Sequence, residues 1–312
     1  MPIRQRLESG LVLVALATFC LAFKGIFARL AYEDGLSVDN LLLLRFLFAV
    51  PLFLLGARWL NRGKPRVRLT RKQWGWAGLT GMLFFLSALF DFNAIKLLGA
   101  SVSRLILYVF PALVMLLQSL LTRRLPPLRQ GMAFVVAWLG IALVLSPGWH
   151  GGGMDPWGVA CGFGAASCYA VFWHISQPLT RELGSVRFNE VSNSFTLVAM
   201  LVFLVPVAHL NQLRYVQPMA WAWVLALVVL TTVLPFFLLF EGLRRADAGE
   251  AGVVAMFGPV VTVLGAWVAV GERLSPIQWA GLVVVLGAMA FMKARRKPEA
   301  VNATVDASAS TR

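Results

Sequence analysis

Residues 105–122 read LILYVFPALVMLLQSLLT, and residues 251–271 read AGVVAMFGPVVTVLGAWVAVG. Both stretches are uncharged, and both are close to the roughly 20 residues that cross a bilayer as a helix. Each stretch carries a proline well inside it, Pro111 in the first and Pro259 in the second. A proline removes one helical hydrogen bond, so we expect a kink at both positions and treat both prolines as hinge candidates.

The two prolines are 148 residues apart, and other features recur at the same offset. Cys20 recurs as Cys168, and Arg45 after its leucines recurs as Asn193 in a similar stretch. Each copy holds five apolar segments. Because five is odd, the second copy must cross a bilayer in the opposite sense to the first. Inverted repeats of this kind are typical of carriers that open alternately to the two sides of a membrane.

The composition favours an all-α integral membrane protein. The chain is 59% hydrophobic and 13% charged, with a mean hydropathy of +0.76. We predict ten transmembrane helices arranged as two inverted five-helix repeats, residues 10–147 and 155–292, followed by a disordered cytoplasmic tail over 293–312. The predicted spans are about 10–30, 38–60, 73–97, 99–121, 129–147, 155–178, 189–208, 219–243, 248–270 and 275–292.

The net charge of +14 does not indicate nucleic-acid binding, because the positive residues alternate between loops. Arg4 and Arg6, the loop 61–72 and residues 293–297 are rich in lysine or arginine. The opposite loops hold only Arg29, Lys96, Arg214 and Arg273. This positive-inside pattern predicts that both termini are cytoplasmic. The three cysteines lie inside spans without metal-ligand spacing, so we expect neither a metal nor another cofactor.

Four ionisable residues lie inside predicted spans, where each carries an energetic cost. They are Lys24, Arg45, Asp91 and Arg104. At 1.5 Å per residue, all four lie roughly 8–10 Å below the outer boundary. Snorkelling or static pairing is one explanation. A shared aqueous cavity is the other, and the aspartate favours it because its side chain is too short to snorkel so far. The net positive layer would suit an anionic solute, and Asp91 is a candidate proton carrier.

Three further residues are candidates for substrate binding or coupling. Tyr108 shares a helical face with Ser101 and Arg104. His174 and Glu241 lie near the inner ends of their spans. His174 is either a hydrogen-bonded interfacial residue or a proton relay. Glu241 is either part of the transport path or paired with the arginines that follow it.

Several local strings resemble the drug/metabolite transporter superfamily, in particular its EamA-like members. The resemblance covers both repeats and rests on the strings Leu44-Arg45-Phe46, Arg104 to Pro111, Phe257-Gly258-Pro259 and Gly271-Glu272-Arg273-Leu274-Ser275. The first repeat departs from the last string, with Thr122-Arg123-Arg124 where a Gly-Glu pair would be expected. The resemblance implies ten helices, a central cavity open alternately to each side, and export of small metabolites or amino-acid-like solutes from a bacterium across its inner membrane.

The leading hypothesis is therefore a secondary transporter, an exporter or exchanger working by alternating access. Its expected partners are a small-molecule substrate, the lipid bilayer and protons as coupling ion, with a homodimer left open. No nucleotide-binding glycine-rich loop occurs, so direct ATP use is not expected. A polytopic receptor or scaffold is the main alternative. An intramembrane enzyme is disfavoured, because no GxSxG, HExxH or CxxC motif occurs.

Overall fold

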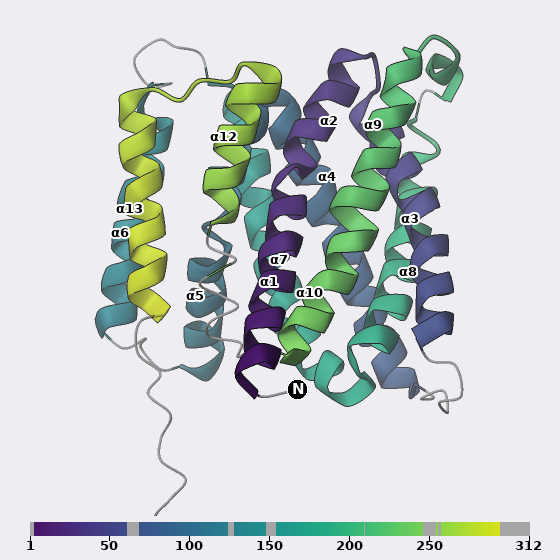
Figure 1. The fold of residues 1–312 in the computed structure, drawn as a ribbon, viewed down its shortest axis with the longest axis horizontal. Helices are drawn as coiled ribbons and strands as arrows, with labels where there is room; N and C mark the ends of the chain where they lie inside the picture. Colours follow the sequence, from purple (N-terminus) through teal and green to yellow (C-terminus); the bar gives the residue numbers. More distant parts are fainter. Residues whose placement is uncertain are drawn as a thin grey trace, which may run out of the picture.

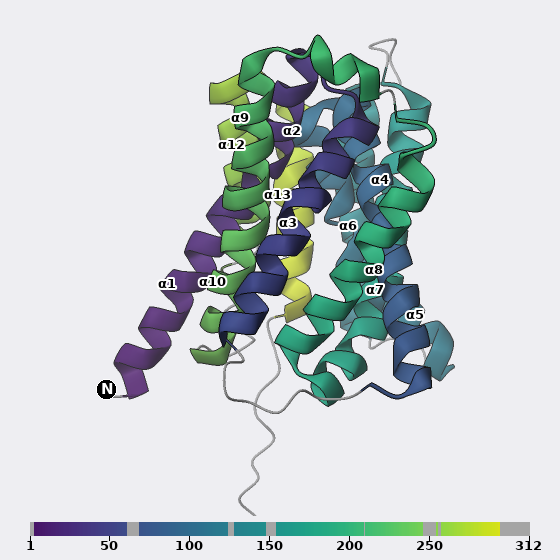
Figure 2. The ribbon, with the colours of Figure 1, turned by 90° about the vertical axis from the view of Figure 1, so that its right-hand side faces the viewer.

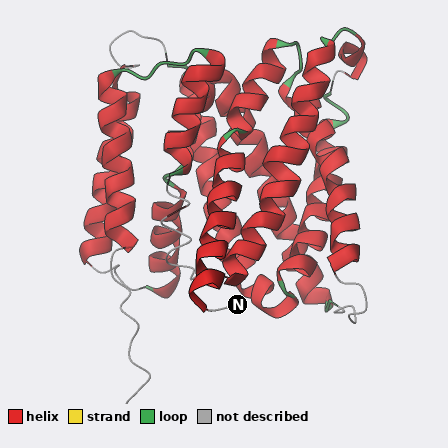
Figure 3. Cartoon of the chain, in the orientation of Figure 1, coloured by secondary structure: helices red, strands yellow, loops and turns green. Residues whose placement is uncertain are grey.

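The computed structural model describes residues 3–60, 69–123, 128–147, 154–208, 210–245, 254 and 257–293. Within these residues the chain is helical and contains no β-strand, as Figure 3 shows. The all-α prediction is confirmed. The predicted tail over 293–312 lies outside the described residues except for Lys293.

The elements follow one another as α-helices with two short irregular turns. They are α1 (Ile3–Ala22), α2 (Lys24–Glu33), α3 (Val38–Leu60), α4 (Arg71–Leu107), α5 (Phe110–Thr122), α6 (Leu128–Pro147), α7 (Pro156–Leu183), α8 (Ser185–Leu204), the 3₁₀ turn η2 (Leu210–Arg214), α9 (Pro218–Val228), the π-helical turn η3 (Val229–Val233), α10 (Leu234–Arg245), α12 (Gly258–Val270) and α13 (Pro276–Lys293).

The helices run up and down between two ends of the molecule. Figures 1 and 2 show that α1 begins and α13 ends at the same end, which we call the terminal end. The tops of α2 and α9 and the connection from α12 to α13 lie at the other end, which we call the distal end. This arrangement is that of a polytopic membrane protein, in which helices satisfy every backbone group internally.

Five helical stretches among the described residues are long and apolar enough to cross a membrane. They are Gly10–Glu33, Val38–Arg58, Arg71–Leu107, Pro156–Thr180 and Pro218–Leu239. Shorter apolar helices cover Ala112–Thr122, Gly258–Val270 and Pro276–Ala288. The count of ten transmembrane helices therefore stays a prediction.

Several predicted spans are interrupted rather than continuous. The first is divided between α1 and α2 at Phe23. The third span and the start of the fourth, predicted as 73–97 and 99–121, both lie within α4, in which Gly99 is non-helical with φ 84° and ψ 169°. The fourth span is divided again at Tyr108 and Val109, after which α5 begins. Membrane carriers commonly place their sites where helices are broken inside the bundle.

The helix contacts look the same when the two predicted repeats are exchanged. α1 packs against α10. The helices at the corresponding positions after exchange are α7 and α4, and they also pack against each other. α3 packs against α8, and α6 against α13. In that last pair Gly140 and Gly281 face each other, since a Cβ added to either would lie 3.0 or 2.7 Å from the other's carbonyl oxygen. Small residues of this kind let membrane helices approach closely.

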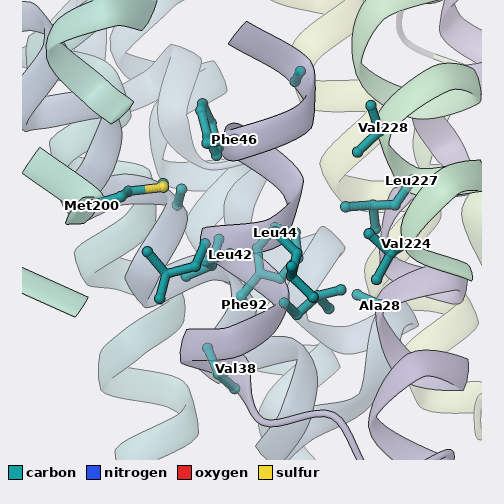
Figure 4. Close-up of a cluster of buried hydrophobic side chains, with 14 of the residues drawn as sticks. Ala28, Val38, Leu42, Leu44, Phe46, Phe92, Met200, Val224, Leu227 and Val228 are labelled. Atoms are coloured by element: carbon teal, nitrogen blue, oxygen red, sulfur yellow. The ribbon is translucent and has the colours of Figure 1, made fainter. Parts of the chain in front are cut away.

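The largest core cluster surrounds α3. Figure 4 shows Leu42, Leu44 and Phe46 of α3 between Met200 of α8 and the α9 residues Leu227 and Val228. Since α3 and α8 belong to different predicted repeats, this core joins the two halves of the chain. It also fixes the height of Arg45, which lies between Leu44 and Phe46 on the same helix.

Candidate functional site

The break between α1 and α2 forms the first wall of the site. The last carbonyl groups of α1 lack intrahelical partners, as at any helix end. Leu21 O accepts a hydrogen bond of 2.8 Å from Arg104 Nη2, and Ala22 O accepts one of 2.9 Å from Thr262 Oγ1. A cation at the negative end of a helix is stabilised by the helix dipole. Arg104 and α12 therefore hold the broken end of α1.

Lys24 is the first residue of α2 and forms an ion pair with Asp91 of α4. Asp91 is 5% exposed, and the Lys24 side chain is 16% exposed. An ion pair so deeply buried must be matched closely, because both groups have lost their hydration. The ion-pair partner of Asp91 is thus the lysine of α2.

Arg45 reaches the same place from α3 and is 5% exposed. Its Nε donates a hydrogen bond of 3.0 Å to Thr232 Oγ1. Its guanidinium carbon lies 5.2 Å from the centroid of the Phe92 ring, and Lys24 Nζ lies 5.7 Å from the same centroid. Two cations thus share one aromatic ring, an arrangement that stabilises positive charge without neutralising it.

Thr232 belongs to the π-helical turn η3 between α9 and α10. Its hydroxyl donates to Leu227 O at 2.8 Å, and the hydroxyl of Thr231 donates to the same oxygen at 2.7 Å. Both threonines are almost fully buried. Such π-helical turns are rare in proteins and occur frequently at functional sites when they interrupt an α-helix.

The four charged residues form one group, which we call the charged cluster: Lys24, Arg45, Asp91 and Arg104. The charge of Arg104 interacts with those of both Lys24 and Arg45, and the charge of Asp91 interacts with those same two residues. The cluster contains three cations and one carboxylate, so its net charge is positive. The structure brings these residues together, while their depth in the membrane and their binding role stay proposals.

Tyr108 and both hinge candidates lie at helix ends beside the cluster. Tyr108 directly follows α4, and a Cβ added to Gly258 would lie 2.4 Å from its hydroxyl oxygen. The prolines do not kink continuous helices: Pro111 lies in the first turn of α5, and Pro259 lies in the first turn of α12. The missing N–H costs nothing there, because a first-turn N–H has no intrahelical partner.

The other two candidates are not part of the charged cluster. His174 lies on α7 and is half-buried, and none of the hydrogen bonds or ion pairs among the described residues joins it to the cluster. Glu241 lies on α10, and its side chain falls outside the described part of the chain. Their predicted roles stay open.

Sequence reasoning missed three residues that complete the site. Phe92 was hidden among many apolar residues, although it directly follows Asp91. Thr232 could have been found, because Thr231-Thr232 is a polar pair within an otherwise apolar stretch. Thr262 gave a weaker signal of the same kind. No group of three or more His, Cys, Asp or Glu side chains that could hold a metal ion occurs among the described residues.

Comparison with known proteins gives a family and a fold. A family model described as the EamA-like transporter family matches residues 8–146 and again residues 156–293. A solved crystal structure superposes with a TM-score of 0.60 at 20% identity, covering 92% of this chain and 96% of that one. This likeness concerns the fold alone.

Curated relatives carry transporter names. The uncharacterized transporter YcbK of Bacillus subtilis is 28% identical over 92% of this chain and 94% of its own. The uncharacterized transporter sll1319 of Synechocystis is 24% identical over 91% and 92%. The threonine/homoserine exporter RhtA of Escherichia coli is 28% identical over 159 residues, which is 49% of this chain and 51% of that protein.

Proposed function

The chain belongs to the EamA-like transporter family and is a multi-pass membrane transporter, and from that premise we propose a secondary carrier that exports or exchanges small metabolites or amino-acid-like solutes. It works by alternating access in a bacterial inner membrane. The observation that carries this proposal is the charged cluster, which is buried where α1 gives way to α2 and beside the π-helical turn.

The charge of the cluster supports an anionic group on the solute. Asp91 offsets one of its three cations, and the ion pair assigns that one to Lys24. The guanidinium groups of Arg45 and Arg104 remain in excess of negative charge. An arginine presents its donors in a planar fork that matches a carboxylate. A solute carboxylate would therefore bind between these two arginines, as a counter-ion for the charge in excess.

The likeness to RhtA supports the amino-acid-like class. That protein is named as an exporter of threonine and homoserine, and both compounds carry a carboxylate and an ammonium group. In the charged cluster, Asp91 offers a partner for an ammonium group and the arginines offer partners for a carboxylate. A zwitterion of this kind fits the cluster without adding net charge to the membrane interior.

Asp91 is also the proposed site of proton coupling. Protonation of its carboxyl would remove the negative partner that the cluster offers to the solute's ammonium group, which favours release of the solute. Deprotonation restores that partner and favours binding, so the site holds a proton and a solute in turn. This sequence of states gives an exchange between a proton and a solute without a catalytic step, and it uses only residues that already contact each other.

Alternating access needs two halves that move against each other. The helix contacts that persist on exchange of residues 10–147 with 155–292 support the inverted-repeat arrangement. The distribution of lysine and arginine among the loops supports placing both termini in the cytoplasm. In this arrangement the terminal end faces the cytoplasm and the distal end faces outward. The helix starts at Pro111 and Pro259 are the proposed hinges, since each proline lies in the first turn of a helix that begins inside its predicted span.

Counterflow in proteoliposomes tests this function. Vesicles containing the purified protein are loaded with unlabelled threonine, homoserine or other small amino acids, and uptake of the labelled compound is recorded with and without a pH gradient. We expect saturable uptake that exceeds that of protein-free vesicles and depends on the gradient. If no compound of a broad amino-acid and organic-acid panel is taken up, the proposal is contradicted.

A further inference from the structure

Glu272 makes a contact that the proposed binding site does not use. It lies in the connection between α12 and α13, at the distal end. Its Oε1 accepts a hydrogen bond of 2.8 Å from Ala100 N, and its Oε2 accepts one of 2.9 Å from Ser101 N. Ala100 and Ser101 begin the second part of α4, after the break at Gly99. A carboxylate that receives two N–H groups at a helix start is strongly bound there.

Gly99 is shaped for this contact in two ways. Its φ of 84° is a conformation that residues with a side chain rarely adopt. A Cβ at this position would also lie 2.7 Å from Glu272 Oε1, which is too close for any real atom pair. The glycine therefore both turns the chain and leaves room for a carboxylate that comes from the other predicted repeat.

The helical segment that Glu272 holds carries a residue of the charged cluster. Arg104 lies one turn beyond Ser101 and donates to Leu21 O at the end of α1. Ser103 Oγ donates to Gly99 O at 2.7 Å, which ties the segment to its own start. A displacement of residues 100–107 at the distal end must therefore move Arg104 against α1.

A cavity of about 330 Å³ adjoins the contact. Arg29 and Arg273 both line it, together with Glu272 and Gly99. These arginines give a carboxylate that leaves the helix start a second place in which its charge is stabilised. The contact can thus exist in two states, one held on Ala100 and Ser101 and one released into the cavity.

We propose that Glu272 is a positioning residue that latches the distal gate: its carboxylate on the Ala100 and Ser101 amides keeps the distal end closed, and its release lets that end open with a shift of Arg104. This inference rests on the proposed alternating access. In this proposal the distal gate is coupled to the charged cluster by the Glu272 carboxylate of the second repeat and by the helix start at Ala100 and Ser101 of the first repeat.

Thiol accessibility in nanodiscs tests the latch, in a chain with Cys20→Ala, Cys161→Ala and Cys168→Ala. Ser101→Cys reports the distal end, because Ser101 lines the cavity and is 2% exposed. In a separate protein, Val14→Cys reports the terminal end, where Val14 is buried against Gly242. With Glu272→Gln we expect Ser101→Cys to react with a water-soluble maleimide about tenfold faster, because a charge-assisted contact is lost. Val14→Cys should react no faster.

The controls separate a latch from a merely structural contact. Arg214→Gln changes an exposed side chain of η2 at the same end, outside the lining of this cavity, and should alter neither rate. Gly99→Ala keeps Glu272 but displaces its carboxylate, so it should act like Glu272→Gln. The latch is wrong if Glu272→Gln leaves the Ser101→Cys rate unchanged. It is equally wrong if both reporters accelerate together, since general loosening would explain that result.

Two features keep this test decisive. If neither variant folds, hydrogen exchange on the unsubstituted protein replaces them: the Ala100 and Ser101 amides should exchange at least about tenfold more slowly than in an unstructured peptide, since both are hydrogen-bonded. Unprotected amides would overturn the latch. None of these rates needs a solute. If Glu272→Gln accelerates the Ser101→Cys reaction but the protein transports no solute, the proposed carrier function is wrong and the latch is retained. If the protein transports a solute but Glu272→Gln leaves that rate unchanged, the latch is wrong and the carrier function is retained.

Discussion

Replacing Asp91 with asparagine is expected to lower the free energy of unfolding by about 3–5 kcal/mol, the usual cost of breaking a buried ion pair. The change leaves Lys24 without its counter-ion, with Arg45 and Arg104 close enough for their charges to repel it. Denaturant unfolding of the detergent-solubilised protein measures the loss. Aspartate and asparagine have nearly the same shape, so a change in packing would not account for it.

Two further proteins make the comparison specific. Glu33→Gln breaks an exposed pair with Arg29 and should cost less than about 1 kcal/mol. Adding Lys24→Met to Asp91→Asn removes the uncompensated cation and should recover much of the lost stability. If Asp91→Asn costs no more than Glu33→Gln, the ion pair does not stabilise the site and this account of the cluster fails.

The stabilised double variant also tests the proton role. Without a titratable carboxyl at position 91, the solute flux that remains should no longer depend on the pH gradient. A flux whose pH dependence matches that of the unsubstituted protein would show that protons couple elsewhere, with His174 the next residue to examine.

Replacing Arg45 with methionine is expected to weaken solute binding without lowering the free energy of unfolding. It should leave the free energy of unfolding unchanged or raise it, because it removes one of three cations that share a single carboxylate. The apparent affinity for the transported solute should fall by about 10- to 100-fold, which corresponds to the loss of a charge-assisted hydrogen bond. Unfolding and concentration-dependent counterflow measure the two quantities on the same preparation.

Arg214→Met is the matched control for that experiment. Arg214 is exposed in η2 at the distal end, away from the charged cluster, so its removal should change neither stability nor affinity. A destabilised Arg45→Met protein with unchanged affinity would mean that Arg45 is a structural residue. The hydrogen bond to Thr232 and the stacking on Phe92 would then be its whole role.

The sequence was informative about helices and less so about their interruptions. Residues 38–60 were predicted as a span and form α3, because a long and mostly apolar run gives a clear signal. The break at Phe23 was not predicted, because it lies inside the predicted span 10–30 and the end of α1 there is held by Arg104 and Thr262 from distant segments. Hydropathy averages over about 20 residues, so it cannot resolve a change at a single residue.

The sequence predicted a common depth for the charged residues, but it did not predict which of them pair with each other. Distance along a helix fixes the depth of a residue, so Lys24, Arg45, Asp91 and Arg104 could be placed in one layer. The partner of each residue depends on how the helices are rotated, which the sequence does not reveal. The string containing Glu272 was recognised as a family signature, but its contact with Ala100 spans 172 residues and required the folded chain.

Two-sided labelling at Thr232 tests the central claim, a buried site that opens in turn to each face of the membrane. Thr232 is 3% exposed and contacts Arg45, so Thr232→Cys in the cysteine-free chain reports the charged cluster itself. The account predicts reaction with a membrane-impermeant thiol reagent in both right-side-out and inside-out vesicles. Reaction from one side only, or from neither side while a lipid-permeant reagent reacts, would contradict it.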